Sequence, residues 1–222
     1  YYFCSMNTLA EENYLKAIFK LSGKQKAAVS TNTIAEELVT KASSVTDMIK
    51  KLTDKNLVNY QKYKGTSLTK KGHEIAVQIV RKHRLWEVFL VKKLNFQWCE
   101  VHDVAEQLEH IKSPKLVEHL DAFLGFPQYD PHGDPIPSKN GEFPKSFSMP
   151  LIDLVIGNKG LVVGVSLENP AFLQYLDKLE IHLGSTIRVI EKVQFDQSLE
   201  IKINGKATHI SSEVAKNILI KQ

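Results

Sequence analysis

The stretch HRLWEVFLVKKLNFQWCEVHDVAEQLEH (residues 83–110) decides the fold, because it sets side chains that bind metal ions within two helical patterns. In the first pattern, His83 and Glu87 are spaced i, i+4 and share a helix face with apolar residues such as Ile79 and Leu90. An imidazole and a carboxylate in an apolar stripe need polar partners, since a buried ion pair costs desolvation. This pattern indicates a metal site, with a structural ion pair as the alternative.

The second pattern collects further metal-binding side chains within an arc of roughly 100° on the next helical segment, opposite an apolar side. These side chains belong to His102, Glu106, Glu109 and His110. An ordinary amphipathic helix has the same distribution, so both interpretations stay open for this segment alone. If the two faces meet, imidazole and carboxylate ligands without thiolate suit Mn²⁺, Fe²⁺, Co²⁺ or Zn²⁺, and spacing does not choose among them.

Length and composition limit the class of protein. A chain of 222 residues with 43% hydrophobic content is long enough for two or three small folded domains. Its apolar runs are shorter than the ~20 residues of a membrane span, and it opens with no secretory signal pattern, so we expect a cytoplasmic protein with no membrane partner. The two cysteines, Cys4 and Cys99, support no disulfide framework. Residues 1–5 do not resemble structured sequence and enter no prediction.

The excess of positive over negative charge is confined to the N-terminal third of the chain. Residues 1–72 hold 12 Lys and six acidic residues, whereas residues 73–126 and 127–222 each carry a net charge of −1. A basic segment attached to near-neutral ones is typical of contact with a polyanion such as DNA, although scattered surface lysines give a similar sum.

This basic segment has the pattern of a winged helix-turn-helix. Apolar residues recur at helical spacing over residues 9–21, residues 33–38 and residues 45–55, and two strand-like pieces follow around a basic turn at residues 61–66. Such a fold places its second helix in the major groove of DNA and its wing on the flanking backbone. Winged helices also act as protein-interaction modules, which is the alternative. The candidate DNA-binding residues are Lys41, Ser43, Ser44, Thr46, Asp47 and Lys50 on the helix and Lys62 and Lys64 on the wing.

The rest of the chain changes from helical to strand-like patterning. A long helix is expected from Lys70 to about Leu94; apolar on more than one side, it favours a homodimer, with packing on the winged helix as an alternative. Prolines and glycines in residues 127–149 predict a linker. Beyond it, alternating residues predict a small β-barrel. Its expected strands are residues 151–156, 161–165, 186–193 and 199–203, and its expected helices are residues 169–179 and 211–220.

This order of segments resembles the diphtheria toxin repressor family of iron- and manganese-dependent regulators over nearly the whole chain. The most specific similarities are Arg81-Lys82-His83-Arg84-Leu85, Glu100-Val101-His102-Asp103, Leu108-Glu109-His110 and Gly133-Asp134-Pro135-Ile136-Pro137. The expected fold is mainly α with a small β part. Its domains are a winged helix-turn-helix at 6–72, a helical metal-binding and dimerisation domain at 73–126, a Pro-rich linker at 127–149 and an SH3-like, FeoA-like barrel at 150–222.

The resemblance also implies two metal sites. One matches His83, Glu87 and His102, with Glu168 at the position of a glutamate contributed by the barrel; the other matches Glu106, Glu109, His110 and Asn13. The family's iron-type members carry Cys at the position of Glu106, and its manganese-type members carry Glu. The resemblance therefore implies Mn²⁺, with Fe²⁺ as a close alternative, because a carboxylate hardens the site.

The function implied is that of a transcriptional regulator, expected to be a repressor, that binds palindromic operator DNA as a dimer when loaded with metal. It would control genes of metal homeostasis and would not be an enzyme. Two alternatives stay open: a metal-independent winged-helix regulator, and a metallohydrolase using the same ligands. The sequence contains no HExxH element, Gly-rich phosphate loop or nucleophile elbow that would favour the hydrolase.

Overall fold

The computed structural model describes residues 7–23, 27–98, 100–144, 148–167 and 169–222. Residues 1–5, both cysteines and Glu168 therefore lie outside the described residues. The chain forms two compact units: unit 1 comprises Tyr1–His83, Leu108–Lys112 and Pro137–Glu142, and unit 2 comprises Arg84–Gln107, Ser113–Ile136 and Phe143–Gln222. The division falls inside one continuous helix, after His83.

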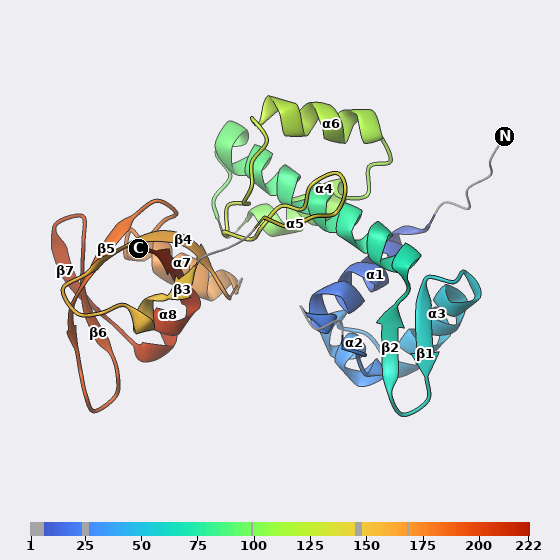
Figure 1. Cartoon of the computed structure of the whole chain (residues 1–222), viewed down its shortest axis with the longest axis horizontal. Coiled ribbons are helices and arrows are strands. Elements are labelled where there is room, and N and C mark those ends of the chain that lie inside the picture. Colours follow the sequence, from blue (N-terminus) through green and yellow to red (C-terminus); the bar gives the residue numbers. More distant parts are fainter. Residues whose placement is uncertain (1–6, 24–26, 99, 145–147, 168) are drawn as a thin grey trace. The chain divides into compact units, whose positions relative to one another are not determined.

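Unit 1 contains the expected helix-turn-helix with its wing (Figure 1). The helices are α1 (Leu9–Ser22), α2 (Thr31–Glu37) and α3 (Ala42–Asp54). The side chain of Thr8 caps α1 by accepting a hydrogen bond from the Glu11 backbone N–H, while the Glu11 carboxylate accepts one from the Thr8 N–H at 2.8 Å. The buried faces of these helices meet in one core, which includes Leu15, Ile34 and Leu52.

The wing is an antiparallel hairpin of β1 (Val58–Gln61) and β2 (Gly65–Leu68). Its inner edge continues through a single bridge between Val29 and Thr66, where two backbone hydrogen bonds of 2.8 Å connect the hairpin to the segment before α2. Helix α4 (Lys70–Leu94) begins two residues after β2, as the sequence predicts. The wing and the metal-binding stretch are therefore joined by one helix.

The helical part of unit 2 consists of the C-terminal part of α4 with α5 (Val101–Leu108) and α6 (Pro114–Phe123). Leu85 and Val88 of α4 are buried against Leu120 of α6 in a small core. Trp86 and Phe89 are half-buried against the same core and make an edge-to-face contact at 5.7 Å between ring centroids. Ile79 and Leu90, which share the face of His83 and Glu87, are buried as well, so α4 is apolar on more than one side, as expected.

The C-terminal part of unit 2 is one antiparallel sheet with strand order β3-β8-β4-β5-β6-β7. Its buried side chains come from alternate strand positions, for example Ile187 and Val189 of β5 and Ile201 and Ile203 of β6. The strands are β3 (Met149–Pro150), β4 (Lys159–Val165), β5 (Thr186–Lys192), β6 (Leu199–Ile203), β7 (Lys206–Ile210) and β8 (Ile218–Lys221), with helices α7 (Pro170–Lys178) and α8 (Ser212–Asn217).

Two sequence expectations for this part are wrong, and one strand was missed. Residues 151–156 do not form a strand, because Leu151–Asp153 is a 3-10 turn following the short strand β3. The helix expected over residues 211–220 ends at Asn217, and residues 218–221 instead form β8, which lies between β3 and β4. Strand β7 was not expected. For residues 218–221, pairing with the distant strands β3 and β4 outweighs the local helical pattern.

The Pro-rich segment is also more than a linker. Asp130, His132 and Ile136 are buried, and a β-bridge joins Tyr129 to Pro135. The segment packs onto β4, since the Val165 N–H donates a 2.8 Å hydrogen bond to the His132 carbonyl. Gly133 (φ 88°) makes this approach possible, because a Cβ there would lie 2.0 Å from the Val163 carbonyl oxygen. No helix in the described ranges is both long enough and apolar enough to cross a membrane.

Candidate metal centre and DNA interface

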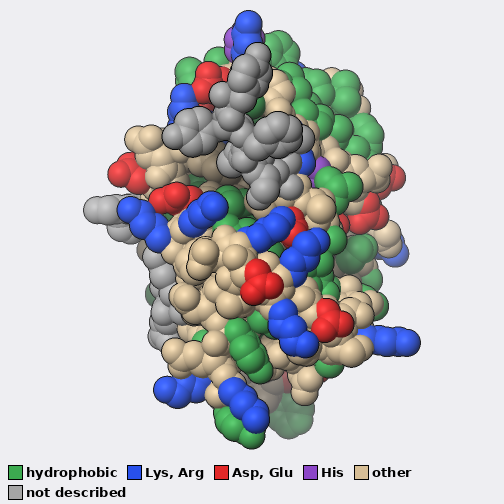
Figure 2. Space-filling view, turned by 90° about the vertical axis from the view of Figure 1, so that its right-hand side faces the viewer, with side chains coloured by type: hydrophobic (Ala, Val, Ile, Leu, Met, Phe, Trp, Pro, Cys, Tyr) green, Lys and Arg blue, Asp and Glu red, His purple; other side chains and the backbone are tan. Residues whose placement is uncertain are grey.

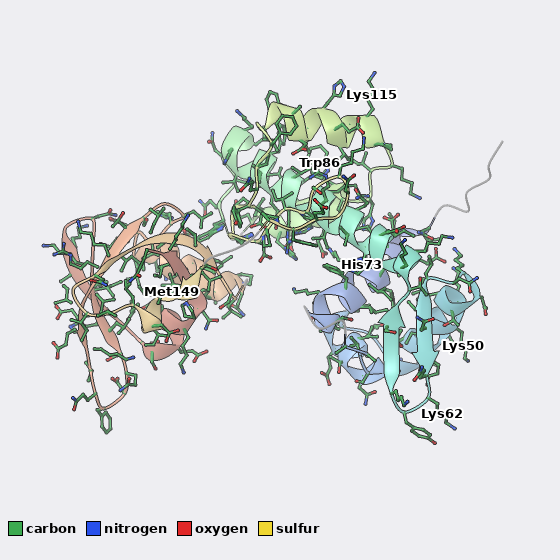
Figure 3. All side chains as sticks on the ribbon, viewed as in Figure 1. Lys50, Lys62, His73, Trp86, Lys115 and Met149 are labelled. Atoms are coloured by element: carbon green, nitrogen blue, oxygen red, sulfur yellow. The ribbon has the colours of Figure 1, made fainter. Side chains whose placement is uncertain are left out.

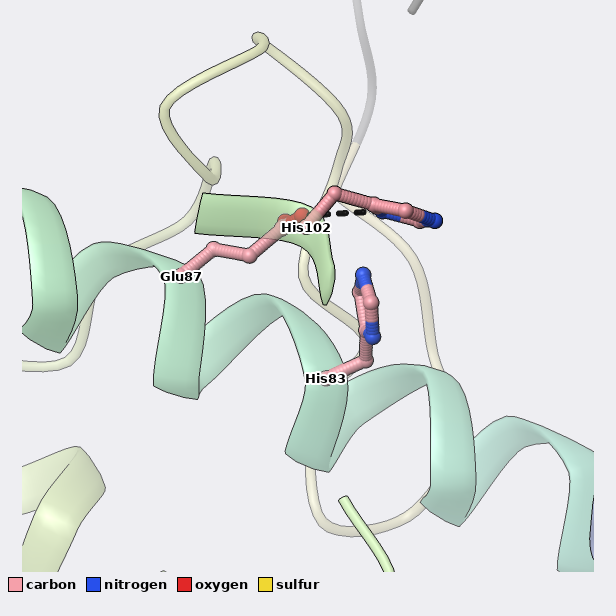
Figure 4. Close-up of side chains that lie close together, drawn as sticks. All are labelled: His83, Glu87 and His102. Atoms are coloured by element: carbon pink, nitrogen blue, oxygen red, sulfur yellow. Dashed lines mark ion pairs between the residues drawn. The ribbon is translucent and has the colours of Figure 1, made fainter. Parts of the chain in front are cut away.

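Glu87 is the central residue of the metal-binding stretch. Its side chain is almost completely buried in α4, one helical turn after His83, and its Oε1 lies 3.5 Å from Nδ1 of His102 on α5. His83, Glu87 and His102 form a group able to hold a metal ion (Figure 4). The first ligand set that the sequence suggests is therefore gathered around α4.

A second metal-capable group shares Glu87 but uses two residues that sequence analysis missed. Glu87, Asp130 and His132 are all buried, and one potential ligand atom of each lies within 4.8 Å of the others. The pattern Asp130-Pro131-His132 was the available signal, an acid and a histidine two residues apart, but it lies among prolines that suggest a linker. Within the described residues, these two groups are the places where three or more metal-binding side chains come together.

The geometry of His132 fits metal binding through Nδ1. Its ring stacks on Trp98 at 5.8 Å with an interplanar angle of 5°, and Nε2 lies 3.2 Å from the Trp98 carbonyl oxygen, to which its N–H donates. Nδ1 is buried and has no hydrogen-bond partner among the described residues, while Oε1 of Glu87 lies 3.7 Å away. An imidazole oriented by one nitrogen and open at the other is the usual form of a histidine ligand.

The charges of this second group are strongly coupled. Burial raises the pKa of Asp130 well above its usual value, the charges of Glu87 and Asp134 raise it further, and Arg84, whose Nε lies 3.4 Å away, opposes the shift. Burial lowers the pKa of His132, but the close contact with the Glu87 carboxylate and the negative charges of Glu87 and Asp130 outweigh it and raise that pKa to about 9. Protons and a divalent cation would therefore compete for the same buried atoms.

Glu109 and His110 meet α1 within unit 1. Helix α5 ends at Leu108, so neither residue belongs to the helical arc that the sequence predicts; both lie in the turn after it. Nδ1 of His110 lies 2.6 Å from Oε2 of Glu12, and the fully buried Glu109 contacts Nδ1 of His83 at 2.6 Å and Nζ of Lys16 at 2.8 Å. Glu12 and Lys16 are additions to the sequence prediction.

Two further predicted ligands, Asn13 and Glu106, lie outside these contacts. Asn13 lies on α1 with its side-chain oxygen buried and without a hydrogen-bond partner among the described residues, which suits a ligand oxygen. Glu106 lies on α5 in unit 2, half-exposed, with Oε1 3.8 Å from Nε2 of His102.

The predicted DNA-binding residues of α3 and of its N-cap position are all exposed. They are Lys41, Ser43, Ser44, Thr46, Asp47 and Lys50. Figure 3 shows Lys50 on α3 and Lys62 at the hairpin tip. At that tip Tyr63 is 92% exposed, with Nζ of Lys62 5.1 Å from its ring centroid, and Lys64 follows. Figure 2, which faces the side carrying α3, shows more Lys and Arg than acidic side chains.

Three family models match the chain in sequence. Residues 6–66 match the iron dependent repressor N-terminal DNA binding domain, residues 69–138 match the iron dependent repressor metal binding and dimerisation domain, and residues 149–222 match the FeoA domain.

Individual relatives agree with these matches. The chain is 36% identical over 113 residues to an uncharacterized HTH-type transcriptional regulator of Methanocaldococcus jannaschii, covering 51% of this chain and 90% of the relative. It is 26% identical to the diphtheria toxin repressor of Corynebacterium diphtheriae, covering 95% and 96%. A solved manganese-dependent transcriptional repressor in complex with manganese is 37% identical, with a TM-score of 0.80 and coverage of 95% and 98%.

These matches extend over the helix-turn-helix, the helical segment and the barrel, and they confirm both the expected fold class and the resemblance seen in the sequence. The chain belongs to the family of iron-dependent repressors, the metal-dependent transcriptional repressors that include the diphtheria toxin repressor.

Proposed function

We propose that this protein is a repressor of metal homeostasis genes that binds palindromic operator DNA as a homodimer in the cytoplasm when it holds Mn²⁺, with Fe²⁺ as the alternative ion. The relatives include an iron-dependent repressor of Mycobacterium tuberculosis and manganese-dependent repressors, and they are regulators rather than enzymes. In this proposal residues 6–72 bind DNA, residues 73–126 hold metal and dimerise, residues 127–149 connect the domains and add Asp130 and His132 to the metal site, and residues 150–222 form the barrel.

One observation carries the proposal: a single helix joins the wing to the metal-capable residues. Helix α4 starts at Lys70, two residues after the wing ends, and carries His83 and Glu87 in its middle. A helix transmits a constraint along its axis because its backbone hydrogen bonds keep it rigid. A metal ion held at His83 and Glu87 therefore restrains the helix that leaves the DNA-binding domain.

We propose two metal sites built from the described residues. The first is centred on Glu87 and uses Asp130 and His132, with His83 and His102 as neighbouring donors. The second uses Glu109 and His110 together with Asn13 of α1, with Glu106 as a further carboxylate. Glu168, which lies outside the described residues, stays a proposed donor for the first site. Oxygen and imidazole donors without thiolate favour Mn²⁺ and Fe²⁺.

The proposed mechanism is a linkage between metal and DNA. The α1 residues Glu12 and Lys16 already contact His110 and Glu109, so an ion bound there would hold α1, and with it the helix-turn-helix, in one position. If the metal fixes the spacing of the two α3 helices in a dimer before DNA binds, the dimer loses less conformational freedom when it binds a palindromic operator. Couplings of this kind are typically about 1–3 kcal/mol, and DNA must tighten metal binding by the same factor.

The experiment that tests this function uses duplex DNA selected from a random library by the Mn²⁺-loaded protein. Fluorescence anisotropy then gives the dissociation constant of that duplex with Mn²⁺, with Fe²⁺ under anaerobic conditions, and with a chelator. We expect binding to tighten about 5- to 150-fold with the physiological ion. A metal-independent regulator would bind equally tightly in the chelator, and a hydrolase would select no duplex.

A further inference from the structure

The outer face of the C-terminal sheet carries a row of three cations on adjacent strands. Lys159 of β4 lies opposite Arg188 of β5, and Arg188 lies opposite Lys202 of β6 in the same register. All three are exposed, because their strand neighbours Gly160, Ile187 and Ile201 point into the barrel core. Directly opposed residues on one face have Cβ atoms about 4.5–5.5 Å apart, and like charges in this arrangement are destabilising.

No acidic residue within the described ranges neutralises this row by an ion pair. The nearest carboxylates along the strands, Glu191 and Glu200, pair with each other in another row beyond a bulge. Glu180 accepts hydrogen bonds from Asn204 and Lys206 instead. The sheet therefore maintains three unpaired positive charges side by side.

The same three cations line a concave pocket of about 830 Å³. The other lining residues come from the loop before β5 and the turn after β6; they include the hydroxyls of Ser185 and Thr186 and the amide of Asn204, and no acidic residue. The three positive charges and the hydrogen-bond donors therefore line one shallow pocket that is open to solvent, an arrangement that can bind an oxyanion.

We propose that this pocket is a binding site for a multiply charged phosphate-type anion, distinct from the metal sites and from the helix-turn-helix. Its ligand is either a free phosphorylated small molecule or the phosphate backbone of nucleic acid, which share the same chemistry. An occupying anion removes the mutual repulsion of Lys159, Arg188 and Lys202, so ligand binding stabilises the barrel. The FeoA-like domain then has a ligand of its own.

The test uses the full-length metal-free protein at low salt, with sodium tripolyphosphate and a non-operator DNA duplex as separate probes. Backbone amide NMR shifts of Gly184, Ser185 and Thr186 report on the pocket directly, independently of any DNA bound to the wing. We expect saturable shifts with at least one probe, and the probe that produces them identifies the source of the anion. The absence of saturable shifts with both probes would overturn the proposal.

Matched variants distinguish specific binding in this pocket from nonspecific electrostatic attraction of the probe to the protein. Arg188→Gln and Lys202→Gln are expected to weaken probe binding about tenfold each, whereas Lys216→Gln, which removes the same charge from α8 of the same barrel, leaves it unchanged. Without probe, Arg188→Gln should leave the melting temperature equal or higher, because repulsion is relieved. Equal weakening by all three variants, or a lower melting temperature for Arg188→Gln without probe, would overturn the proposal.

Discussion

Nδ1 of His132 lies 3.7 Å from Oε1 of Glu87, and both side chains are almost completely buried. The two residues are distant in the chain, one in the middle of α4 and the other in a loop between prolines. Burying an imidazole beside a carboxylate, with Asp130 added, is expensive unless the group is paired or binds a cation. This arrangement leads directly to a prediction about metal affinity.

Replacing His132 with alanine should weaken Mn²⁺ binding at the Glu87 site at least tenfold, because the site loses one of its imidazole donors. Isothermal titration calorimetry measures this loss. His209→Ala is the matched control, since His209 is exposed on β7. If the His132 variant binds Mn²⁺ as tightly as the parent does, the ligand role of His132 is wrong.

Glu106→Ala and His110→Ala should each abolish the tightening of DNA binding by metal while leaving a folded dimer. Neither change removes a large apolar side chain, so the hydrophobic core is not emptied. Mobility shift with and without Mn²⁺, together with sedimentation, separates lost response from lost folding. A parental response in either variant would contradict the second metal site.

Replacing Glu106 with cysteine should move the preference from Mn²⁺ toward Fe²⁺, Co²⁺ or Ni²⁺, because thiolate is a softer donor. The side chain is 46% exposed, so the fold should tolerate the change. Anaerobic titrations of DNA binding against each ion give the rank order. Identical rank orders for parent and variant would show that another residue sets selectivity.

The affinity for operator DNA should fall steeply as the salt concentration rises. Lys62→Ala or Lys64→Ala should each reduce the slope of log K against log salt concentration by about one unit, because each lysine that contacts a phosphate releases about one counterion. Lys216→Ala in the barrel is the control. Should neither wing variant change the slope, the wing is not part of the DNA interface.

Glu11 should make stability depend on acid pH. Burial raises its pKa, but hydrogen bonds and charge from Lys55, the Thr8 N–H and Lys51 outweigh this effect and lower that pKa from 4.5 to about 2. The contribution is therefore complete above the unfolded pKa near 4.5 and is lost as pH falls toward 2. Glu11→Gln should cost about 1–3 kcal/mol at pH 7, and the cost should shrink below pH 4.5.

Denaturant unfolding of the two proteins across this pH range measures the effect. Glu36→Gln, which removes an exposed carboxylate of α2, is the control and should change little. A difference between parent and Glu11→Gln that stays constant down to pH 2 would disprove the assignment.

The sequence predicts those parts of the fold that rest on local patterns. Helix α4 begins at Lys70 as expected, because wing and helix are separated by a change of period, and His83 and Glu87 share its face through i, i+4 spacing. The helix-turn-helix is equally local. The family resemblance supplies the order of the domains and the two expected metal sites, which composition alone does not predict.

What the sequence conceals depends on contacts between distant segments. Asp130 and His132 resemble linker residues in the sequence, but their loop packs on β4. Residues 218–220 have a helical pattern, but they belong to β8, which lies between β3 and β4. Helix α5 ends at Leu108, and Glu109 in the turn that follows contacts His83 and Lys16, which are distant in the sequence. The periodicity of a short stretch of sequence cannot predict contacts with residues that are distant in the chain.

The central claim, that metal and DNA binding are coupled, is tested most directly by measuring Mn²⁺ affinity calorimetrically with and without the selected operator duplex. The account predicts that the duplex tightens Mn²⁺ binding by the same factor, about 5- to 150-fold, by which Mn²⁺ tightens duplex binding. Mn²⁺ affinities that are equal in the presence and absence of the duplex would contradict it.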